Sequence, residues 1–350
     1  MIKVLIVDDS VFMRTILKDI IGRDPEIEVL GTAVDGIDAL AKIERLEPDI
    51  ITLDIEMPRM NGIELLQKLR RSPFAKKPKI LMLSSLTAEG AEMTLKAIRL
   101  GASDFILKPT DLRKVRAIEE DVVGKIKHLI TLPDAIVKKT TPRTGSVTDN
   151  DKAETLVLIG SSAGGPQMLD TLLSMFPADL GAGVVITQHM PVGFTAALAE
   201  RFNRICPLDV KETENGDIIT RNNILLSKAG YHTIITSAQT TPGRITGKVV
   251  HSSGQPLHGV KPAVDKTFIS ASKVYGKNIV SVILSGMGSD GGAGMLAIKE
   301  AGGRTFVVRE DECLVYGMAR SALEHNAVQE TFSLKKMADE IHRAVRKIGG

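Results

Sequence analysis

Five polar side chains that could together accept a phosphoryl group stand where short apolar runs end in the amino-terminal part of the chain. They are three carboxylates, a hydroxyl and an ammonium group: Asp8, Asp9, Asp54, Ser84 and Lys108. Carboxylates packed together repel one another unless a cation joins them, and Mg²⁺ is a hard cation that prefers oxygen ligands. Lys108 can pair with an oxygen of a metal-bound phosphoryl group, and Asp54 can attack phosphorus as a nucleophile. The set therefore predicts a carboxylate that is phosphorylated with the help of Mg²⁺.

Helix-length amphipathic segments separate the apolar runs, which is the pattern of parallel strands joined by crossover helices. The runs lie within five expected strand–helix units between Met1 and about Ile130, at 4–7, 50–53, 79–83 and 104–107. The carboxyl ends of parallel strands meet at one edge of their sheet, so the five polar side chains should converge there. Any one of them alone could be an ordinary loop residue, but all five at successive strand ends favour a site.

Residues 1 to about 125 resemble a response-regulator receiver domain. Four stretches match the motifs of that family in order and spacing: VDDS (7–10), LDIEMPRMNG (53–62), LSS (83–85) and ILKP (106–109). The resemblance implies a flavodoxin-like, five-stranded parallel sheet in which Asp54 is the phosphoacceptor.

The receiver resemblance also implies roles for the residues around the phosphoacceptor. The residues that would hold Mg²⁺ are Asp9 and Asp54 directly, Asp8 through water, and Glu56 through its backbone carbonyl. Two side chains would contact the phosphoryl group, and these are Ser84 and Lys108. Phe105 occupies the position of the family's aromatic switch residue.

The composition argues against several classes of protein. A total of 45 Lys and Arg against 42 Asp and Glu leaves a net charge of +3, which argues against nucleic-acid binding as the main function. Cys206 and Cys313 give no disulfide framework and no metal-ligand spacing, so both are expected to be reduced. The first apolar run is too short for a signal peptide, and no run approaches the ~18 to 20 residues of a membrane helix. We therefore expect a cytoplasmic protein without direct membrane insertion.

The strand–helix pattern stops after Thr131, and the next stretch predicts a linker. Residues 132–154 are rich in Pro, Thr, Ser, Lys and Asp with little to bury, a composition typical of flexible linkers. Apolar periodicity resumes at Thr155, and we expect a doubly wound, mostly parallel α/β domain with a β-rich excursion near 205–255. The predicted division is a receiver domain at 1–130, a linker at 131–154 and a catalytic domain at 155–350.

A strand-to-helix turn in the second domain carries a candidate nucleophile. The stretch GSSAG (160–164) fits the pattern G-x-S-x-G, whose spacing selects Ser162 over Ser161. Glycines on both sides allow a sharp turn that exposes a serine hydroxyl and leaves backbone N–H groups free to hold an oxyanion. A small turn that only opens a helix or cradles a phosphate would have the same sequence pattern.

A serine hydroxyl needs a base to take its proton, and a histidine at the next strand end could supply it. His189 follows the run VVITQ, and Asp290, which could orient the imidazole, lies after another strand in the stretch SGMGSDGGAGM. Three other candidate histidines lie in the less regular middle region: His232, His251 and His258. The order Ser, His, Asp differs from the Ser, Asp, His order of α/β-hydrolases, so that fold is not predicted.

The glycine-rich stretch around Asp290 also fits a dinucleotide-binding fingerprint. Its glycines have the spacing G-x-G-x-x-G, with acidic residues about 20 positions later; the residues are Gly286, Gly288, Gly291, Glu310 and Asp311. Against this alternative, Asp290 would place a negative charge inside the loop that should hold a pyrophosphate.

Almost the whole chain resembles the chemotaxis protein-glutamate methylesterase family, CheB. The motifs that carry the resemblance are IGSSAGGP (159–166), QHMPVGFT (188–195), LSGMGSDGGAGM (284–295), HGVKPAVDKTF (258–268) and VYGMARSA (315–322). The resemblance implies that Ser162 is the nucleophile, His189 the general base and Asp290 its orienting partner. The backbone N–H groups of Met287 and Ala163 would stabilise the oxyanion, and Ala163 stands where the family commonly has threonine.

This resemblance implies a phosphorylation-activated serine hydrolase that mediates adaptation in bacterial chemotaxis. The enzyme would demethylate glutamate γ-methyl esters on the cytoplasmic helices of methyl-accepting chemoreceptors, release methanol and deamidate certain receptor glutamines, without a cofactor for the esterase reaction. A chemotaxis histidine kinase would be the phosphodonor for Asp54, and the unphosphorylated receiver would cover the esterase site. Alternatives from other classes are a nucleotide-dependent oxidoreductase, a non-catalytic signalling adaptor and a DNA-binding regulator, the last disfavoured by the long α/β second half.

Overall fold

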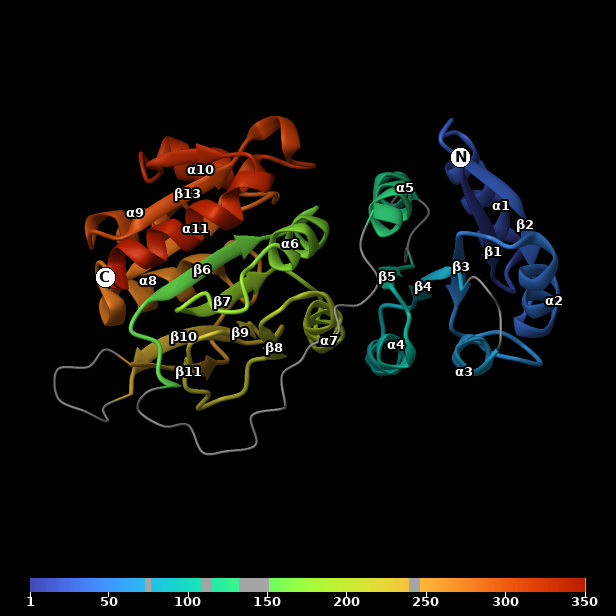
Figure 1. Cartoon of the computed structure of the whole chain (residues 1–350), viewed down its shortest axis with the longest axis horizontal. Coiled ribbons are helices and arrows are strands. Elements are labelled where there is room, and N and C mark those ends of the chain that lie inside the picture. The colour runs from blue at the N-terminus through green and yellow to red at the C-terminus, as the bar shows by residue number, and fades with distance from the viewer. Residues whose placement is uncertain (73–76, 109–114, 132–150, 239–245, 350) are drawn as a thin grey trace. The chain divides into compact units, whose positions relative to one another are not determined.

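The computed structural model describes residues 1–72, 77–108, 115–131, 151–238 and 246–349, without the side chains of 115–121 (Figure 1). The chain divides into two compact units, Met1–Pro133 and Asp134–Gly350, each with its own sheet and core. Across the described residues, every helix is too short or too polar to span a lipid bilayer.

The first unit is a parallel five-stranded sheet in the order β2-β1-β3-β4-β5. Its strands are β1 (Ile2–Val7), β2 (Ile27–Ala33), β3 (Ile50–Asp54), β4 (Lys79–Ser84) and β5 (Asp104–Leu107). Its helices are α1 (Val11–Gly22), α2 (Gly36–Leu46), α3 (Gly62–Arg71), α4 (Ala88–Leu100) and α5 (Val115–Thr131). The expected flavodoxin-like fold is confirmed. No continuous apolar run marks β2, because this edge strand buries only Ile27 and Ala33 fully.

The second unit contains a parallel seven-stranded sheet in the order β14-β13-β12-β6-β7-β9-β8. Its strands are β6 (Leu156–Ser161), β7 (Gly183–Gln188), β8 (Asp209–Glu212), β9 (Asn223–Leu226), β12 (Ile279–Ile283), β13 (Arg304–Val308) and β14 (Glu330–Phe332). Its helices are α6 (Gly165–Ser174), α7 (Thr195–Ile205), α8 (Val264–Tyr275), α9 (Gly292–Glu300), α10 (Gly317–Glu324) and α11 (Leu334–Gly349), with a 3₁₀ turn at Glu310–Glu312.

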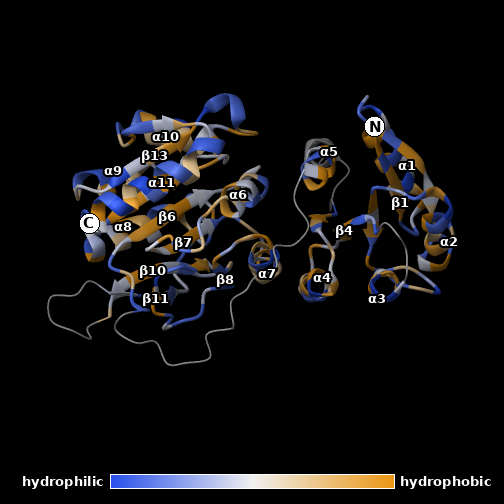
Figure 2. Ribbon diagram, viewed as in Figure 1, coloured by the Kyte–Doolittle hydropathy of each residue, from blue (hydrophilic) through white to orange (hydrophobic). Residues whose placement is uncertain are grey.

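Helices cover both faces of this sheet, as expected for a doubly wound domain. Successive residues of a strand point to opposite faces, so Val157 and Ile159 pack with α6, α7 and α11, whereas Leu156 and Leu158 pack with α8, α9 and α10. Figure 2 shows hydrophobic residues along β6 and β7 and both hydrophobic and hydrophilic residues on α11. Burial on both faces explains why these strands read as continuous apolar runs in the sequence.

The β-rich excursion expected near 205–255 is confirmed, since β8, β9 and two further strands lie within it. Within the described residues, β10 (His232–Ser237) and β11 (Gly247–Ser252) form a separate two-stranded antiparallel sheet. The two strands before them, β8 and β9, pair in parallel and extend the main sheet beyond β7.

The predicted linker, residues 131–154, falls mostly outside the described residues. Its last residues are described and contact the second unit: the Ala153 N–H donates to the Ile219 carbonyl at 3.1 Å, and the Arg221 N–H donates to the Asp151 carbonyl at 2.8 Å. Ala153 is fully buried. This part of the stretch therefore packs with the second unit just before β6 begins.

Candidate active site and phosphoacceptor site

The candidate nucleophile lies in a tight turn between β6 and α6. A Cβ on Gly165 would come within 2.4 Å of Gln188 Oε1 and 2.7 Å of Ser161 Cβ, so only glycine fits at the start of α6. Gly164 has a φ of +76°, a left-handed value that glycine adopts without strain. The turn leaves Ser162 partly exposed, directly after the end of β6.

The two adjacent serines have different surroundings. Ser161 is fully buried, and its hydroxyl donates to Gln188 Oε1 at 2.6 Å. The amide nitrogen of Gln188 donates to the carbonyl oxygens of Ser162 and His189, both at 2.9 Å. Gln188 thus ties the nucleophile turn to the strand end that carries His189. The sequence analysis missed this role, although Gln188 directly precedes His189 in the motif QHMPVGFT.

His189 and Asp290 form the hydrogen-bonded pair that a triad requires. His189 Nε2 lies 2.8 Å from Asp290 Oδ2. The Asp290 carboxylate is 2 % exposed and also accepts the backbone N–H groups of Val264 at 2.6 Å and Asp265 at 2.9 Å. Because Nε2 faces the carboxylate, Nδ1 is the ring nitrogen left to accept a proton from a nucleophile.

The strands that carry the three predicted triad residues are neighbours, because the sheet order places β12, β6 and β7 side by side. The Ser162 N–H donates to the Ser285 carbonyl at 2.9 Å, directly after β12. The structure therefore brings Ser162, His189 and Asp290 to one edge of the sheet. Within the described residues, the Ser162 hydroxyl forms no hydrogen bond to His189, a bond that commonly tightens only when substrate binds.

Two backbone N–H groups next to Ser162 are available to bind an oxyanion. Those of Ala163 and Met287 donate no hydrogen bond within the described part of the chain. A Cβ on Gly286 would lie 3.0 Å from Ser162 Cβ, so the loop that carries Met287 passes directly beside the nucleophile. The predicted oxyanion role needs such unpaired donors at this position.

The other candidate histidines have different partners. His232 Nδ1 accepts the Ala263 N–H at 3.2 Å, and His258 Nε2 lies 2.9 Å from Asp265 Oδ2. His251 contacts Thr213 and stacks on Tyr231, and burial lowers its pKa. Of the histidines in the described chain, His189 is the one hydrogen-bonded to Asp290.

The surroundings of Asp290 also disfavour a dinucleotide in this loop. Its carboxylate lies at the amino-terminal ends of two helices and already accepts the N–H groups that open α8. A pyrophosphate would have to occupy the same region as this buried charge. The geometry therefore favours the triad over the nucleotide fingerprint.

The acidic residues of the first unit meet Lys108 at the carboxyl edge of its sheet. Lys108 Nζ lies 2.7 Å from Asp54 Oδ2 and 3.1 Å from Asp8 Oδ2. Burial raises the pKa of Asp54 to about 6, although the charge of Lys108 partly offsets this rise. Burial acts to lower the pKa of Lys108, but the carboxylates of Asp54 and Asp8 together raise this pKa above its usual value.

The acidic cluster fits a Mg²⁺ site. Asp8, Asp9 and Asp54 each offer a carboxylate oxygen, and these atoms lie within 4.8 Å of one another. All the donors are oxygens, the type that Mg²⁺ prefers, and Lys108 can balance only one of the three charges. Glu56, predicted to contribute its backbone carbonyl, lies two residues after the end of β3 with an exposed side chain.

The other two predicted receiver residues contact different partners from Asp54. The Ser84 hydroxyl accepts from Thr94 Oγ1 at 2.7 Å and lies 3.1 Å from the Gly90 carbonyl, both in α4. Phe105 is buried, and Lys125 Nζ donates to its carbonyl at 2.6 Å while lying 5.6 Å from its ring centroid. Ser84 would therefore have to leave its partners in α4 to reach a phosphoryl group on Asp54.

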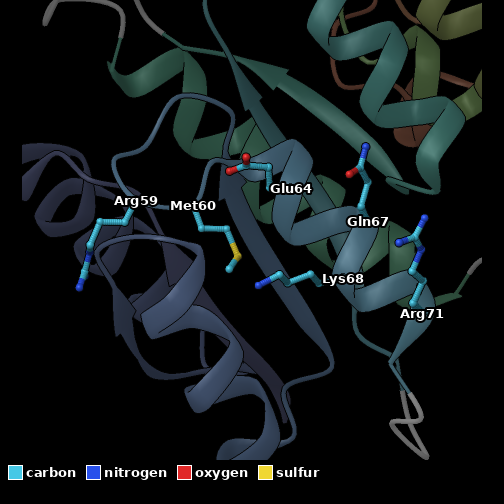
Figure 3. Close-up of a pocket in the computed structure, with 6 residues that line it drawn as sticks. All are labelled: Arg59, Met60, Glu64, Gln67, Lys68 and Arg71. Atoms are coloured by element: carbon cyan, nitrogen blue, oxygen red, sulfur yellow. The ribbon is translucent and has the colours of Figure 1, made fainter.

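A hollow of about 300 Å³ lies on the first unit outside the acidic cluster (Figure 3). Its lining comes from the loop before α3 and from α3 itself: Arg59, Met60, Glu64, Gln67, Lys68 and Arg71. Two of these groups already have partners, because Glu64 accepts the Asn61 N–H and Arg59 pairs with Asp35. No predicted site residue lines the hollow, and we assign it no catalytic chemistry.

Together, the two sites define a class of protein in which a receiver-type phosphoacceptor domain is joined to a hydrolase domain with a doubly wound parallel sheet and a Ser/His/Asp site. Comparison with protein families agrees with this class. The model of the response regulator receiver domain matches residues 4–119, and the model of CheB methylesterase matches residues 157–341. The chain belongs to the CheB methylesterase family, with an amino-terminal receiver domain.

Known relatives share the full length of the chain. A protein-glutamate methylesterase/protein-glutamine glutaminase 1 from Methanospirillum hungatei is 52% identical over 351 residues, covering 100% of both chains. A protein-glutamate methylesterase/protein-glutamine glutaminase from Pyrococcus horikoshii is 38% identical over 100% of this chain and 95% of its own. The crystal structure of the Thermotoga maritima CheB methylesterase catalytic domain matches with a TM-score of 0.51 and 31% identity, covering 54% of this chain and 97% of that one.

Proposed function

We propose that this protein hydrolyses glutamate γ-methyl esters on chemoreceptors and deamidates receptor glutamines, and that phosphorylation of its receiver domain activates both reactions. The observation that carries the proposal is the hydrogen bond between His189 and Asp290 beside the turn that holds the partly exposed Ser162. The names of its full-length relatives supply the substrate class. Both reactions exchange the group on a side-chain carbonyl for water-derived oxygen, so one nucleophile can perform both.

In the first half of the ester reaction, the Ser162 hydroxyl attacks the γ-carbonyl carbon. His189 Nδ1 takes the serine proton, and the Asp290 carboxylate at Nε2 stabilises the charged imidazolium. The N–H groups of Ala163 and Met287 donate to the oxyanion of the tetrahedral intermediate. When the bond to the methoxy oxygen breaks, His189 returns the proton to that oxygen, and methanol leaves an acyl-serine.

In the second half, water replaces the alcohol. His189 Nδ1 removes a proton from water as the water oxygen attacks the acyl carbon, and the same proton then passes to Ser162 Oγ as the acyl–serine bond breaks. The product is a glutamate carboxylate. A glutamine side chain follows the same course with ammonia as the leaving group.

In the receiver, Asp54 is the proposed phosphoacceptor, and a histidine kinase of the chemotaxis system is the proposed phosphodonor. Asp9 and Asp54 directly, Asp8 through water and the Glu56 carbonyl would hold Mg²⁺, which when bound neutralises charge on the transferring phosphoryl group. Lys108 already lies against Asp54 and can follow the phosphoryl oxygen.

The contacts of Ser84 connect phosphorylation of Asp54 with a change in the helix α4. A phosphoryl group on Asp54 adds charge and strong acceptor oxygens that can draw the Ser84 hydroxyl from Gly90 and Thr94. Loss of these two contacts would loosen α4 and change the surface of the receiver around this helix. A cytoplasmic location follows from the proposed partners, since both the kinase and the receptor helices are expected there.

The decisive experiment measures methanol release from methylated chemoreceptor membranes by wild type and Ser162→Ala, each with and without a small-molecule phosphodonor and Mg²⁺. Release should rise with phosphodonor in the wild type and be lost in Ser162→Ala under both conditions. Ser161→Ala is the matched control, because the neighbouring serine is buried against Gln188 and should not react. Equal release from folded wild type and Ser162→Ala would refute the serine-esterase mechanism.

A further inference from the structure

The two helices behind the triad, α8 and α9, begin after residues whose side chains cannot cap their first backbone N–H groups. The residue before α8 is Ala263 and the residue before α9 is Gly291, and neither has a polar side chain. The first N–H groups of a helix have no partner within the helix, and leaving them unsatisfied in a buried position is costly. Their acceptors must come from elsewhere in the fold.

Each helix receives its cap from the segment that belongs to the other. Asp290, just before α9, accepts the N–H groups of Val264 and Asp265 at the start of α8, at 2.6 and 2.9 Å. Asp265, in the first turn of α8, accepts the N–H groups of Gly291 and Gly294 at the start of α9, at 3.0 and 2.7 Å. The triad carboxylate and Asp265 are therefore held reciprocally.

Close packing leaves this exchange little freedom. A Cβ on Gly294 would lie 2.6 Å from Phe268 Cβ and 3.2 Å from the Asp265 Cα, so the two helices meet at a distance that only glycine permits. Asp265 is 3 % exposed. A displacement of Asp265 would therefore be transmitted to Gly291 and so to the adjacent Asp290.

His258 contacts Oδ2 of Asp265, the carboxylate oxygen that accepts neither of the two backbone N–H groups of α9. Its Nε2 lies 2.9 Å from Asp265 Oδ2, while its side chain is 36 % exposed. The histidine sits in a tight turn in which Leu257 and Val260 exchange backbone hydrogen bonds at 3.1 and 3.0 Å. His258 itself has a φ of +55°, so the backbone is shaped to present this side chain.

These side chains form a hydrogen-bonded unit rather than a cation site. Ligand atoms of His258, Asp265 and Asp290 lie within 4.8 Å of one another. However, each of the four carboxylate oxygens already faces at least one N–H donor, from backbone or imidazole. The cluster thus completes a chain from His258 through Asp265 and Asp290 to His189.

We propose that Asp265 is a positioning residue for the catalytic triad, acting through Asp290, and that His258 fixes Asp265 in the required orientation. The inference rests on the proposed roles of Ser162, His189 and Asp290. Its consequence is that kcat depends on side chains that touch neither the substrate nor the reacting atoms.

The test compares two pairs of variants in the full-length, phosphodonor-activated protein. Asp265→Ala removes both caps of α9, whereas Asp265→Asn keeps an oxygen acceptor for the two N–H groups. His258→Ala removes the donor to Asp265, whereas His258→Gln keeps an N–H at a similar reach. Each variant is assayed for kcat and KM of methanol release, for covalent labelling of Ser162 by a fluorophosphonate, and for its melting temperature; His342→Ala on α11 is the matched control.

The alanine variants should lose about 10- to 100-fold in kcat, the loss that follows when a catalytic group is displaced by about 1 Å, with KM unchanged. Labelling of Ser162 should slow in parallel, and the Asn and Gln variants should recover most of both rates. If Asp265→Ala fails to fold, the comparison of His258→Ala with His258→Gln decides the test, because His258 is partly exposed. Wild-type kcat and labelling in folded His258→Ala and Asp265→Ala, or a change in KM alone, would overturn the proposal. A wild type that labels at Ser162 but releases no methanol would instead refute the proposed substrate.

Discussion

The phosphoacceptor site and the esterase site occupy equivalent places in their two sheets, yet their carboxylates are held in different ways. Both sites gather side chains at the carboxyl ends of parallel strands. In the receiver, Asp54 and Asp8 share the ammonium group of Lys108. In the second unit, Asp290 is fixed by backbone N–H groups of α8 and by His189. A charge pair can change partners when a cation or phosphoryl group arrives, whereas a carboxylate held by backbone stays in place, as preorganised catalysis requires.

The largest effect on kcat should come from replacing Asp290, the carboxylate that backbone N–H groups hold in place. Asp290→Asn should lower kcat by about 10³- to 10⁴-fold, because an amide cannot stabilise the charged His189 and allows the wrong imidazole tautomer. Single-turnover methanol release with phosphodonor present measures the loss. Asp311→Asn is the control, since this exposed carboxylate pairs only with the nearby Arg309 within the described chain and should keep the wild-type rate. A wild-type rate in Asp290→Asn would show that the pair with His189 is not catalytic.

Removing Mg²⁺ should affect the phosphoacceptor site and leave the esterase site unaffected. With EDTA, the phosphodonor should no longer stimulate methanol release, because the acidic cluster lies in the receiver. The basal rate should be unchanged, because the proposed triad mechanism uses no metal. Asp54→Asn in the presence of Mg²⁺ should give the same result. A basal rate that falls with EDTA and recovers with added metal would contradict this separation and indicate a metal in the second unit.

The smallest effect concerns the stability of the receiver as the pH changes. The pKa of Asp54 is raised to about 6 in the folded state, so the folded receiver binds this proton more tightly than the unfolded chain does. Without Mg²⁺, the free energy of unfolding should therefore fall by roughly 1 kcal/mol as the pH rises from about 5 to about 7. Urea unfolding at the two pH values measures the change.

The control for this pH effect is Asp54→Asn, which has no carboxyl proton to lose and should abolish the difference. Saturating Mg²⁺ should abolish it too, because a cation favours the charged carboxylate. An unchanged pH dependence in Asp54→Asn would assign the effect to another group.

The sequence predicted the fold and the site wherever the signal was local. Apolar runs marked four receiver strands and the strands that carry Ser162, His189 and Asp290, because both faces of those strands are buried. The edge strand β2 had no continuous apolar run to mark it, because most of its residues are only partly buried. The parallel pairing of the short β8 and β9 with the main sheet was not predicted either. Which strands pair is decided by contacts between distant segments.

The supporting residues were the harder part to predict. Gln188 contacts Ser162 across 26 positions, and Asp265 contacts Asp290 across 25. His258 contacts Asp265 across 7 positions. Sequence spacing does not reveal such hydrogen bonds. The orientation of Ser84 toward α4 is a choice of rotamer that depends on Thr94, ten residues later. A motif identifies the type of chemistry, whereas the packing around it determines how each group is held.

The buried hydroxyl of Ser161 has a consequence for how the enzyme can change over time. Ser161 pairs in register with Gln188 at the end of β6, and Ser162 begins the turn. Shifting a strand by one residue sends each side chain to the opposite face. A one-residue insertion in Leu156–Ser161 would therefore bring Ser161 to the reactive position, and a one-residue deletion would move Ser162 to the buried one. The length of one short strand, as much as the residue itself, therefore determines which of two identical side chains becomes reactive.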